Sequence, residues 1–379
     1  MNFELTDDQR LFLHTIQRFL ASEASIAHTR ALHAAGKSFD QDVWRRSAEL
    51  GWTSLLVPEA QGGGSISGDG LLDAVLIAEE MGRNVSPGPL LSVNVVAQTL
   101  AREGTDGLHA GVLADLLCGE VVGTWAVDEG AGTWDARAVG MRAERHGETW
   151  LLDGTKAFVV DAPVADWLLV TARAPEGLTQ FLVRADSPGL TIKPRASLDL
   201  VRSVGDLSFD NVRVEATSVV GIVGGAEEAV EQQFRTALVL QQAETVGALD
   251  RVFEFTLEYA SQRMAFGRPI SSYQVIKHRF ADLRMWLEAC HATAQASAVA
   301  VAGDSLNAGE LVSVAASYIA ERAPLMVQDC VQIHGGIGVT WEHDLHLYLR
   351  RVTQNAHLFG GVREHRDRIA GVIRMGSSA

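Results

Sequence analysis

The sequence has few cysteines, a minority of basic side chains and no long apolar run. Its three cysteines, Cys118, Cys290 and Cys330, lie far apart and never form a Cys-x-x-Cys pair. This spacing argues against a disulfide framework and against a zinc site, so we expect no metal. Because free cysteine is among the most buried residue types and each of the three is bordered by apolar residues, we expect all three to fill core space.

Basic residues are outnumbered, because 32 Lys and Arg stand against 47 Asp and Glu, a formal net charge of −15. Such a surface, without a concentrated basic stripe, repels nucleic acid and anionic lipid. No apolar run approaches the roughly 18 residues that span a bilayer, and the N-terminus has neither the basic nor the apolar part of a signal peptide. We predict a cytoplasmic protein that binds no nucleic acid and has no membrane span.

Hydrophobic residues are abundant: they make up 47% of the 379 residues, and charged residues make up 21%. This composition is typical of a globular protein, and the length allows two or three domains. The segment Thr6-Asp7-Asp8-Gln9 has the pattern of a helix-capping box. A stripe at three-to-four spacing follows it, at Leu11, Phe12, Thr15, Ile16, Phe19 and Leu20. We predict an all-helical domain over residues 1–118.

The pattern changes to short strand-like runs between residues 119 and 224. These runs lie at 121–127, 150–152, 157–160, 167–171, 181–183 and 212–214. No helical pattern separates them, which favours an antiparallel β-barrel or sandwich over parallel βαβ units. Helical spacing then returns over 225–379, with an apolar stripe at Val230, Phe234, Leu238, Val246, Leu249, Phe253 and Leu257. We therefore predict an α+β multidomain fold that ends in a helical bundle.

Two segments of the predicted bundle have residues suited to ligand binding. One is Arg263-Met264-Ala265-Phe266-Gly267, followed by Gln274, and the other runs from Gln332 through Gly335-Gly336 to Gly338. Paired glycines let a backbone present its N–H groups to a pyrophosphate at a helix terminus. Without further context, a helix-capping turn explains Gly335-Gly336 better than a ligand does, and a solvated or salt-bridged surface arginine explains Arg263 better.

Together with other motifs, these segments resemble the acyl-CoA dehydrogenase family nearly end to end. The matching motifs are Leu50-Gly51-Trp52, Pro58-Glu59, Gly62-Gly63-Gly64, Asp153-Gly154-Thr155-Lys156, Ala165-Asp166-Trp167, Phe209-Asp210-Asn211-Val212-Arg213-Val214 and the two bundle segments. The resemblance implies an N-terminal helical domain, a middle antiparallel β-domain and a C-terminal four-helix bundle. It also implies FAD, which accepts a hydride from the β carbon of an acyl-CoA while a carboxylate removes the α proton. Electron-transfer flavoprotein is the electron acceptor that the resemblance implies.

In this family each flavin is held by two chains, one through its β-domain and the other through its bundle. The resemblance assigns six residues of this chain to a neighbour's flavin: Arg263, Phe266, Gln274, Gln332, Gly335 and Gly336. The contacts to the chain's own flavin have changed. Val127-Asp128-Glu129 before Ala131-Gly132-Thr133 replaces a Thr-Glu-Pro, and Phe158-Val159-Val160 replaces a Trp-Ile-Thr, so two hydroxyl contacts are lost.

Both places where the family carries its catalytic base are also changed. The first aligns with Gly360 and the second with Ala237, and neither can accept a proton. Gln241 and Glu244 continue a polar line from Ala237 along one helix face, so Glu244 is an alternative base, although an ion-paired structural role explains it better. Glu364 is disfavoured because Arg363, His365, Arg366 and Arg368 suggest a solvated, charged face.

We therefore expect no catalytic residue in this chain. The hypothesis is a base-lacking subunit that pairs with a second acyl-CoA dehydrogenase subunit in a heterotetramer, as in the actinobacterial members that shorten steroid side chains. In this hypothesis the base that removes the α proton of the acyl-CoA belongs to the partner subunit. Two alternatives stay open: a homotetrameric enzyme that uses Glu244 as base, and a flavin-free scaffold.

Overall fold

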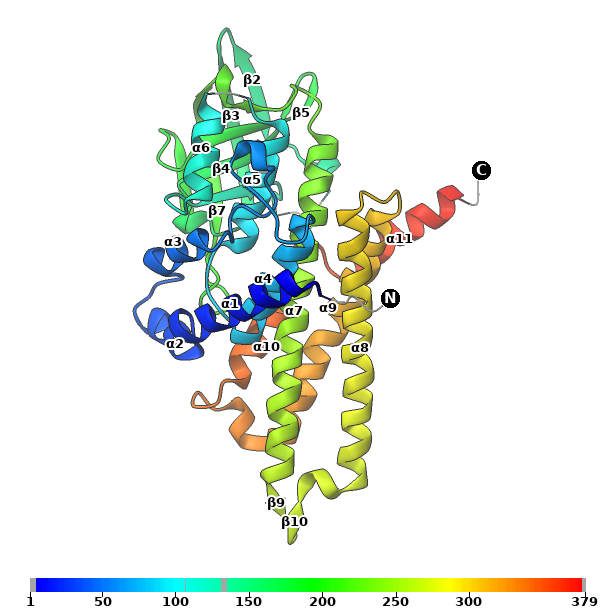
Figure 1. Ribbon diagram of the computed structural model, residues 1–379. Coiled ribbons are helices and arrows are strands. Elements are labelled where there is room, and N and C mark those ends of the chain that lie inside the picture. The colour runs from blue at the N-terminus through cyan, green and yellow to red at the C-terminus, as the bar shows by residue number, and fades with distance from the viewer. Residues whose placement is uncertain (1–4, 106, 131–134, 377–379) are drawn as a thin grey trace.

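The chain folds first into helices, then into a sheet, and then into a second set of longer helices (Figure 1). The computed structural model describes residues 5–105, 107–130 and 135–376. This order confirms the predicted α+β fold class with two helical domains around a β-domain. In the described part of the chain, none of the helices is long and apolar enough to cross a membrane.

The N-terminal part consists of short helices around a shared apolar core. They are α1 (Asp7–Glu23), α2 (Ile26–Ala34), α3 (Gln41–Glu49), η1 (Glu59–Gln61), α4 (Gly70–Asn84), α5 (Leu90–Glu103) and α6 (Leu108–Leu117). The predicted capping box is present, because the Gln9 amide donates to Thr6 Oγ1 and the Thr6 amide donates to Gln9 Oε1, both at 3.1 Å. Phe12 and Ile16 of the predicted stripe are buried, whereas Leu11 points to solvent.

The middle part is one sheet in which the described strands follow the order β6-β7-β3-β2-β4-β5-β8 and β1 pairs with β4. The strands are β1 (Gly123–Ala126), β2 (Arg142–His146), β3 (Thr149–Val160), β4 (Trp167–Ala174), β5 (Gly177–Arg184), β6 (Leu190–Pro194), β7 (Val204–Glu215) and β8 (Val219–Val220), with short helices η2 (Ala136–Ala138), η3 (Ala162–Val164) and η4 (Ala216–Ser218). Most pairings are antiparallel as predicted, but β1 and β2 run parallel to β4. The runs 150–152 and 157–160 form one bulged strand, β3.

The C-terminal part is dominated by three long helices. Its elements are α7 (Glu227–Gln262), β9 (Met264–Ala265), β10 (Arg268–Pro269), η5 (Ile270–Ser272), α8 (Gln274–Ala302), α9 (Ala308–His334), η6 (Gly335–Val339), α10 (Leu345–Asn355) and α11 (Val362–Gly376). Helices α7, α8, α9 and α10 form the bundle, and α7 also packs along α4 (Figure 1). The predicted stripe of α7 is buried from Val230 to Leu249, but Leu257 is exposed near the end of the helix.

Two glycines let α4 and α7 approach unusually closely. A Cβ atom added at Gly82 would lie 1.9 Å from the Glu244 carbonyl oxygen, and one added at Gly247 would lie 1.9 Å from the Glu79 carbonyl oxygen. No side chain fits at these distances, so the backbones of the two helices are in direct contact. This contact fixes the depth at which the Glu244 side chain enters the interior.

The cysteine prediction is correct at two positions and wrong at the third. Cys290 and Cys330 are fully buried, and burial raises the pKa of each thiol to about 12. Cys118 is exposed, because it caps the C-terminal end of α6 where the chain turns toward the sheet. Its apolar neighbours in sequence face the core while its own side chain does not.

Candidate functional site

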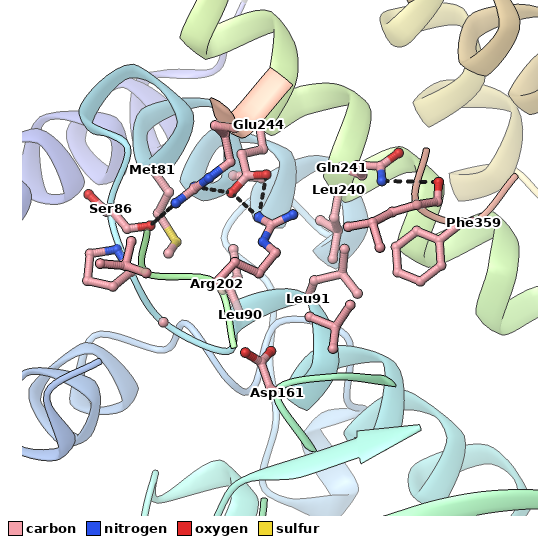
Figure 2. A pocket seen from close by; sticks show the side chains of 17 residues that line it. Met81, Ser86, Leu90, Leu91, Asp161, Arg202, Leu240, Gln241, Glu244 and Phe359 are labelled. Carbon is pink, nitrogen blue, oxygen red and sulfur yellow. Dashed lines mark hydrogen bonds and ion pairs between the residues drawn. The ribbon is translucent and has the colours of Figure 1, made fainter. Parts of the chain in front are cut away.

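A small cavity lies where the three domains meet (Figure 2). We call it the central cavity. Its walls come from α4 and α5, from the end of β3, from the loop before β7, from α7 and α10, and from the segment after α10. The residues that line it include Met81, Leu90, Leu91, Val160, Asp161, Arg202, Leu240, Gln241, Glu244, Arg351 and Phe359. Only about 40 Å³ is left inside it.

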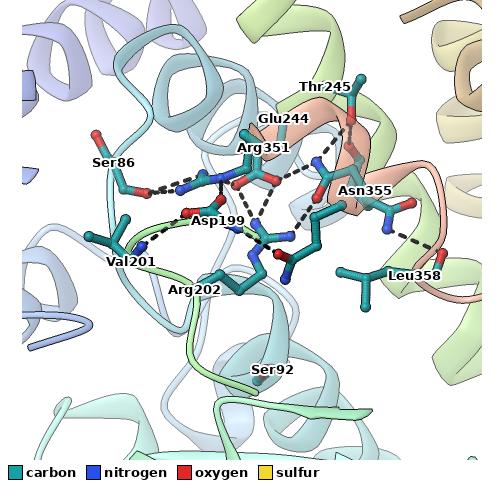
Figure 3. Close-up of polar contacts among 12 residues, drawn as sticks. Ser86, Ser92, Asp199, Val201, Arg202, Glu244, Thr245, Arg351, Asn355 and Leu358 are labelled. Carbon is teal, nitrogen blue, oxygen red and sulfur yellow. Dashed lines mark hydrogen bonds and ion pairs between the residues drawn. The ribbon is translucent and has the colours of Figure 1, made fainter. Parts of the chain in front are cut away.

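Glu244 enters this cavity as the centre of a hydrogen-bonded ion cluster (Figure 3). Arg202 Nη2 donates to both of its carboxylate oxygens, at 2.7 and 2.6 Å. Arg351 Nη1 donates to Oε1 at 2.7 Å and Asn355 Nδ2 donates to Oε2 at 2.8 Å. Arg351 Nε also contacts the carboxylate of Asp199. We refer to these five residues as the ion cluster.

The electrostatics of the ion cluster make Glu244 a poor base. Burial by itself raises the pKa of this carboxyl, but Arg202 and Arg351 more than reverse that effect, and the pKa falls to about 2. Burial lowers the pKa of the Arg351 guanidinium, and Asp199 and Glu244 raise it again to well above its usual range. A carboxylate with so low a proton affinity does not remove an α proton effectively, so the geometry argues against the Glu244 alternative.

Asp161 is the other carboxyl on the wall of the central cavity. Burial raises its pKa to about 6, although Ser92 Oγ donates a hydrogen bond to its Oδ2 at 2.7 Å. A proton affinity of this kind would suit a general base. The small space beside Asp161 leaves no room for an acyl thioester to present its α carbon.

Of the three positions that the resemblance assigns to the chain's own flavin, two are closed by apolar packing and the third, Phe158, is partly exposed. Val127 and Val160 are buried, and Trp125 stacks on Phe359 with ring centroids 5.6 Å apart. Phe158 is 42% exposed at a φ of +54°, and the Arg195 guanidinium covers its ring at 4.2 Å. The Ala131-Gly132-Thr133 segment lies outside the described residues.

The first base position, Gly360, faces a buried histidine. A Cβ atom added at Gly360 would lie 3.0 Å from His365 Nε2, and the φ of +107° would strain any side chain there. The prediction of a solvated face around Glu364 is wrong for His365, which is 1% exposed. The Glu364 carboxylate accepts the Gly361 amide at 2.6 Å in the first turn of α11, which is a structural role.

His365 should make stability depend on pH. Burial lowers its pKa from 6.5 to about 4. Between these values the unfolded chain binds more protons, so the free energy of unfolding should rise by about 3 kcal/mol from pH 4 to pH 6.5. We expect urea unfolding of His365→Gln to show a flatter pH dependence than wild type. His14→Gln on the exposed face of α1 is the control, and equal slopes for both variants would contradict this assignment.

The six residues assigned to a neighbour's flavin lie at the turn of the β9–β10 hairpin, at the adjoining ends of α7 and α8, and where α9 ends and η6 begins. The hairpin projects from the end of the bundle (Figure 1). We call this group the bundle tip: Arg263, Phe266, Gln274, Gln332, Gly335 and Gly336. Arg263 caps α7, Gln274 begins α8, and Gly335 caps α9 with a φ of +67°. Tyr259 links the ends of α7 and α9, because its hydroxyl donates to the His334 carbonyl at 3.3 Å.

All residues of the bundle tip are exposed, and none lines the central cavity. Phe266 is 98% exposed at the turn of the hairpin. The two sets therefore differ in their surroundings: Val127 and Val160 are buried, whereas every residue of the bundle tip is exposed. Sequence reasoning did not single out Asp199, Arg202, Arg351 or Asp161, because no local motif marks them.

Comparisons with known proteins agree with this architecture. Family models of the acyl-CoA dehydrogenase N-terminal, middle and C-terminal domains match residues 6–120, 124–212 and 224–373. The chain is 31% identical over 377 residues to acyl-CoA dehydrogenase FadE27 of Mycobacterium tuberculosis, covering 97% of this chain and 98% of that protein.

Among solved structures, the chain resembles one in the ChsE4-ChsE5 complex of Mycobacterium tuberculosis, with a TM-score of 0.89, 29% identity and 99% of each chain covered. It also resembles one in a variant of the Tcur3481-Tcur3483 steroid ACAD, with a TM-score of 0.88 and 29% identity, covering 98% of this chain and 99% of that one. The chain belongs to the acyl-CoA dehydrogenase family, a family of oxidoreductases whose cofactor is FAD.

Proposed function

We propose that this chain is the non-catalytic subunit of a heteromeric acyl-CoA dehydrogenase. It completes the FAD site of a second, base-carrying subunit, and the complex desaturates an acyl-CoA between its α and β carbons. The observation that carries the proposal is the contrast between the exposed bundle tip and the buried, apolar Val127 and Val160 on the flavin face of the same chain. Electron-transfer flavoprotein is the acceptor we propose for the electrons.

The residues present fit one half of a flavin site and not the other. At the bundle tip, the exposed backbone at Gly336 and the cation of Arg263 suit a pyrophosphate. The exposed ring of Phe266 offers an apolar surface to the adenosine part. Beside the central cavity, Val127 and Val160 have no hydroxyl to offer, and the stacked Trp125 and Phe359 rings occupy the interior.

The carboxyl groups near the central cavity support the same division of labour. Gly360 and the fully buried Ala237 have no side chain that can accept a proton. The Glu244 carboxylate is ion-paired with two guanidinium groups, those of Arg202 and Arg351. When bound, the flavin supplies a hydride acceptor, but α-proton removal still requires a carboxylate. We assign that carboxylate to the partner subunit.

The proposal also covers the subunit assembly and the acyl group of the substrate. Both solved structures with 29% identity carry the names of two different chains, and one of them is described as a steroid ACAD. Since this chain covers nearly all of both, we propose a heterotetramer of two copies of each subunit that acts on a steroid side-chain acyl-CoA.

Flavin stoichiometry tests the proposal. Expressed alone, the chain should retain little FAD, and co-expressed with its partner it should give about one FAD per pair of chains. In the complex, Arg263→Ala should lower flavin content, because a cation beside the pyrophosphate is lost. Arg284→Ala is the matched control, since this exposed arginine of α8 pairs with Glu288 on the same helix.

Each alternative has its own signature in that experiment. A flavin-free scaffold would keep the same flavin content after Arg263→Ala. One tightly bound FAD per chain in a homo-oligomer of this subunit, reduced by acyl-CoA, would overturn the proposal in favour of a self-sufficient enzyme.

A further inference from the structure

We infer that the ion cluster closes this chain's own acyl-CoA pocket by occupying it from within, so that acyl-CoA enters only the partner's pocket. The inference rests on the proposed function, because it explains how a subunit without a base avoids binding substrate unproductively. Its location follows from the walls of the central cavity. Val160 belongs to the flavin-facing segment, Phe359 precedes the first base position, and Gln241 follows the second by one turn.

The volume of the central cavity is the first argument for closure. Pockets that bind small molecules measure roughly 300–1,000 Å³, whereas about 40 Å³ is left here. The side chains of Arg202, Glu244 and Arg351 occupy the place of a ligand, and Figure 3 shows them paired with one another. Their side chains are 13%, 11% and 2% exposed, so little water shares the space with them.

The charges of the ion cluster are the second argument. Two guanidinium groups face two carboxylates, Asp199 and Glu244, so the cluster is neutral as a whole. An acyl chain that entered would have to separate a guanidinium from its carboxylate in a buried site. Leaving a buried charge without its partner is strongly unfavourable, so the apolar gain from one acyl chain would not open the pocket.

The ion cluster also links all three domains, because its residues belong to the middle and C-terminal domains and contact Ser86 of the N-terminal domain (Figure 3). Arg351 on α10 donates to the Ser86 carbonyl between α4 and α5, at 3.4 Å, and also contacts Asp199 in the loop before β7. Arg202 of that loop donates to Asn355 Oδ1 at 2.6 Å. The cluster therefore holds together the walls that would have to separate for a ligand to enter.

Thiol labelling of the full-length chain in its complex tests this closure, with Ala78→Cys as a reporter on the cavity wall. The native cysteines supply references in the same sample, since Cys118 is exposed while Cys290 and Cys330 are buried. With the ion cluster intact, N-ethylmaleimide should label Cys118 at least about tenfold faster than the reporter. The double change Arg202→Ala and Glu244→Ala should accelerate reporter labelling by about tenfold or more, since it empties the cavity and leaves Arg351 paired with Asp199.

A volume-matched control separates closure from charge. Arg202→Met with Glu244→Met fills the same space without ions, and the reporter should stay protected. Fast reporter labelling with the cluster intact, or continued protection after the alanine changes, would overturn the inference. If Cys290 and Cys330 also react, the alanine variant has unfolded. The test then rests on the protein with the intact ion cluster, in which the reporter must be labelled more slowly than Cys118. The FAD count per pair of chains is a separate readout, so failure here does not imply failure of the proposed function.

Discussion

Replacing Arg351 by methionine is expected to lower the free energy of unfolding by about 3–5 kcal/mol. This guanidinium is 1% exposed and pairs with both Asp199 and Glu244. Its removal leaves the buried Asp199 carboxylate without a cation, with the Val201 amide as a remaining donor, and methionine fills the volume without supplying a charge. Urea unfolding of the chain, followed by circular dichroism, measures the loss.

The neighbouring arginine provides the control for that change. Arg350 lies on the same helix, is half-buried, and donates a single hydrogen bond of 3.3 Å to the Leu198 carbonyl. Arg350→Met should cost less than about 1 kcal/mol. Adding Asp199→Leu to Arg351→Met should recover part of the loss, because it removes the carboxylate that has lost its cation while Glu244 stays paired with Arg202. Equal costs at positions 350 and 351 would contradict the energetic role of the cluster.

Gly247→Ala is expected to destabilise the chain by about 3 kcal/mol or more, because the added methyl group overpacks a closed contact. The new Cβ atom would lie 1.9 Å from the Glu79 carbonyl oxygen, which belongs to the backbone of α4 and cannot rotate away. Helices α4 and α7 would have to separate, and the wall of the central cavity would move with them. Thermal unfolding and the yield of soluble protein measure the effect.

Gly371→Ala is the matched control for this substitution. Gly371 is also helical, within α11, and a Cβ atom there meets nothing within 4 Å. Alanine favours a helix over glycine by about 1 kcal/mol, so this variant should be slightly more stable than wild type. The two substitutions should therefore change the stability in opposite directions. Similar changes for both would show that the contact between the α4 and α7 backbones does not exclude a side chain at position 247.

The fold was predictable where the signal in the sequence is local. The Thr6 to Gln9 capping box begins α1, and the stripe from Val230 to Leu249 is buried along α7. Strand β2 was missed because most of Arg142–His146 is exposed and charged, which hides the alternation of a strand. The exposure of Cys118 and the burial of His365 were also missed, because neighbours in sequence do not decide on which side of an element the core lies.

The order of the domains, the family motifs and the absence of a carboxylate at positions 237 and 360 can be read from the sequence. They follow from residue identity and from regular spacing along one chain. The role of Glu244 required the folded structure, since its partners Arg202, Arg351 and Asn355 lie 42, 107 and 111 residues away in sequence. The tertiary structure also decided that the central cavity is filled while the bundle tip is open. The strength of a buried charge depends on distances and solvent access that arise only when the three domains pack together.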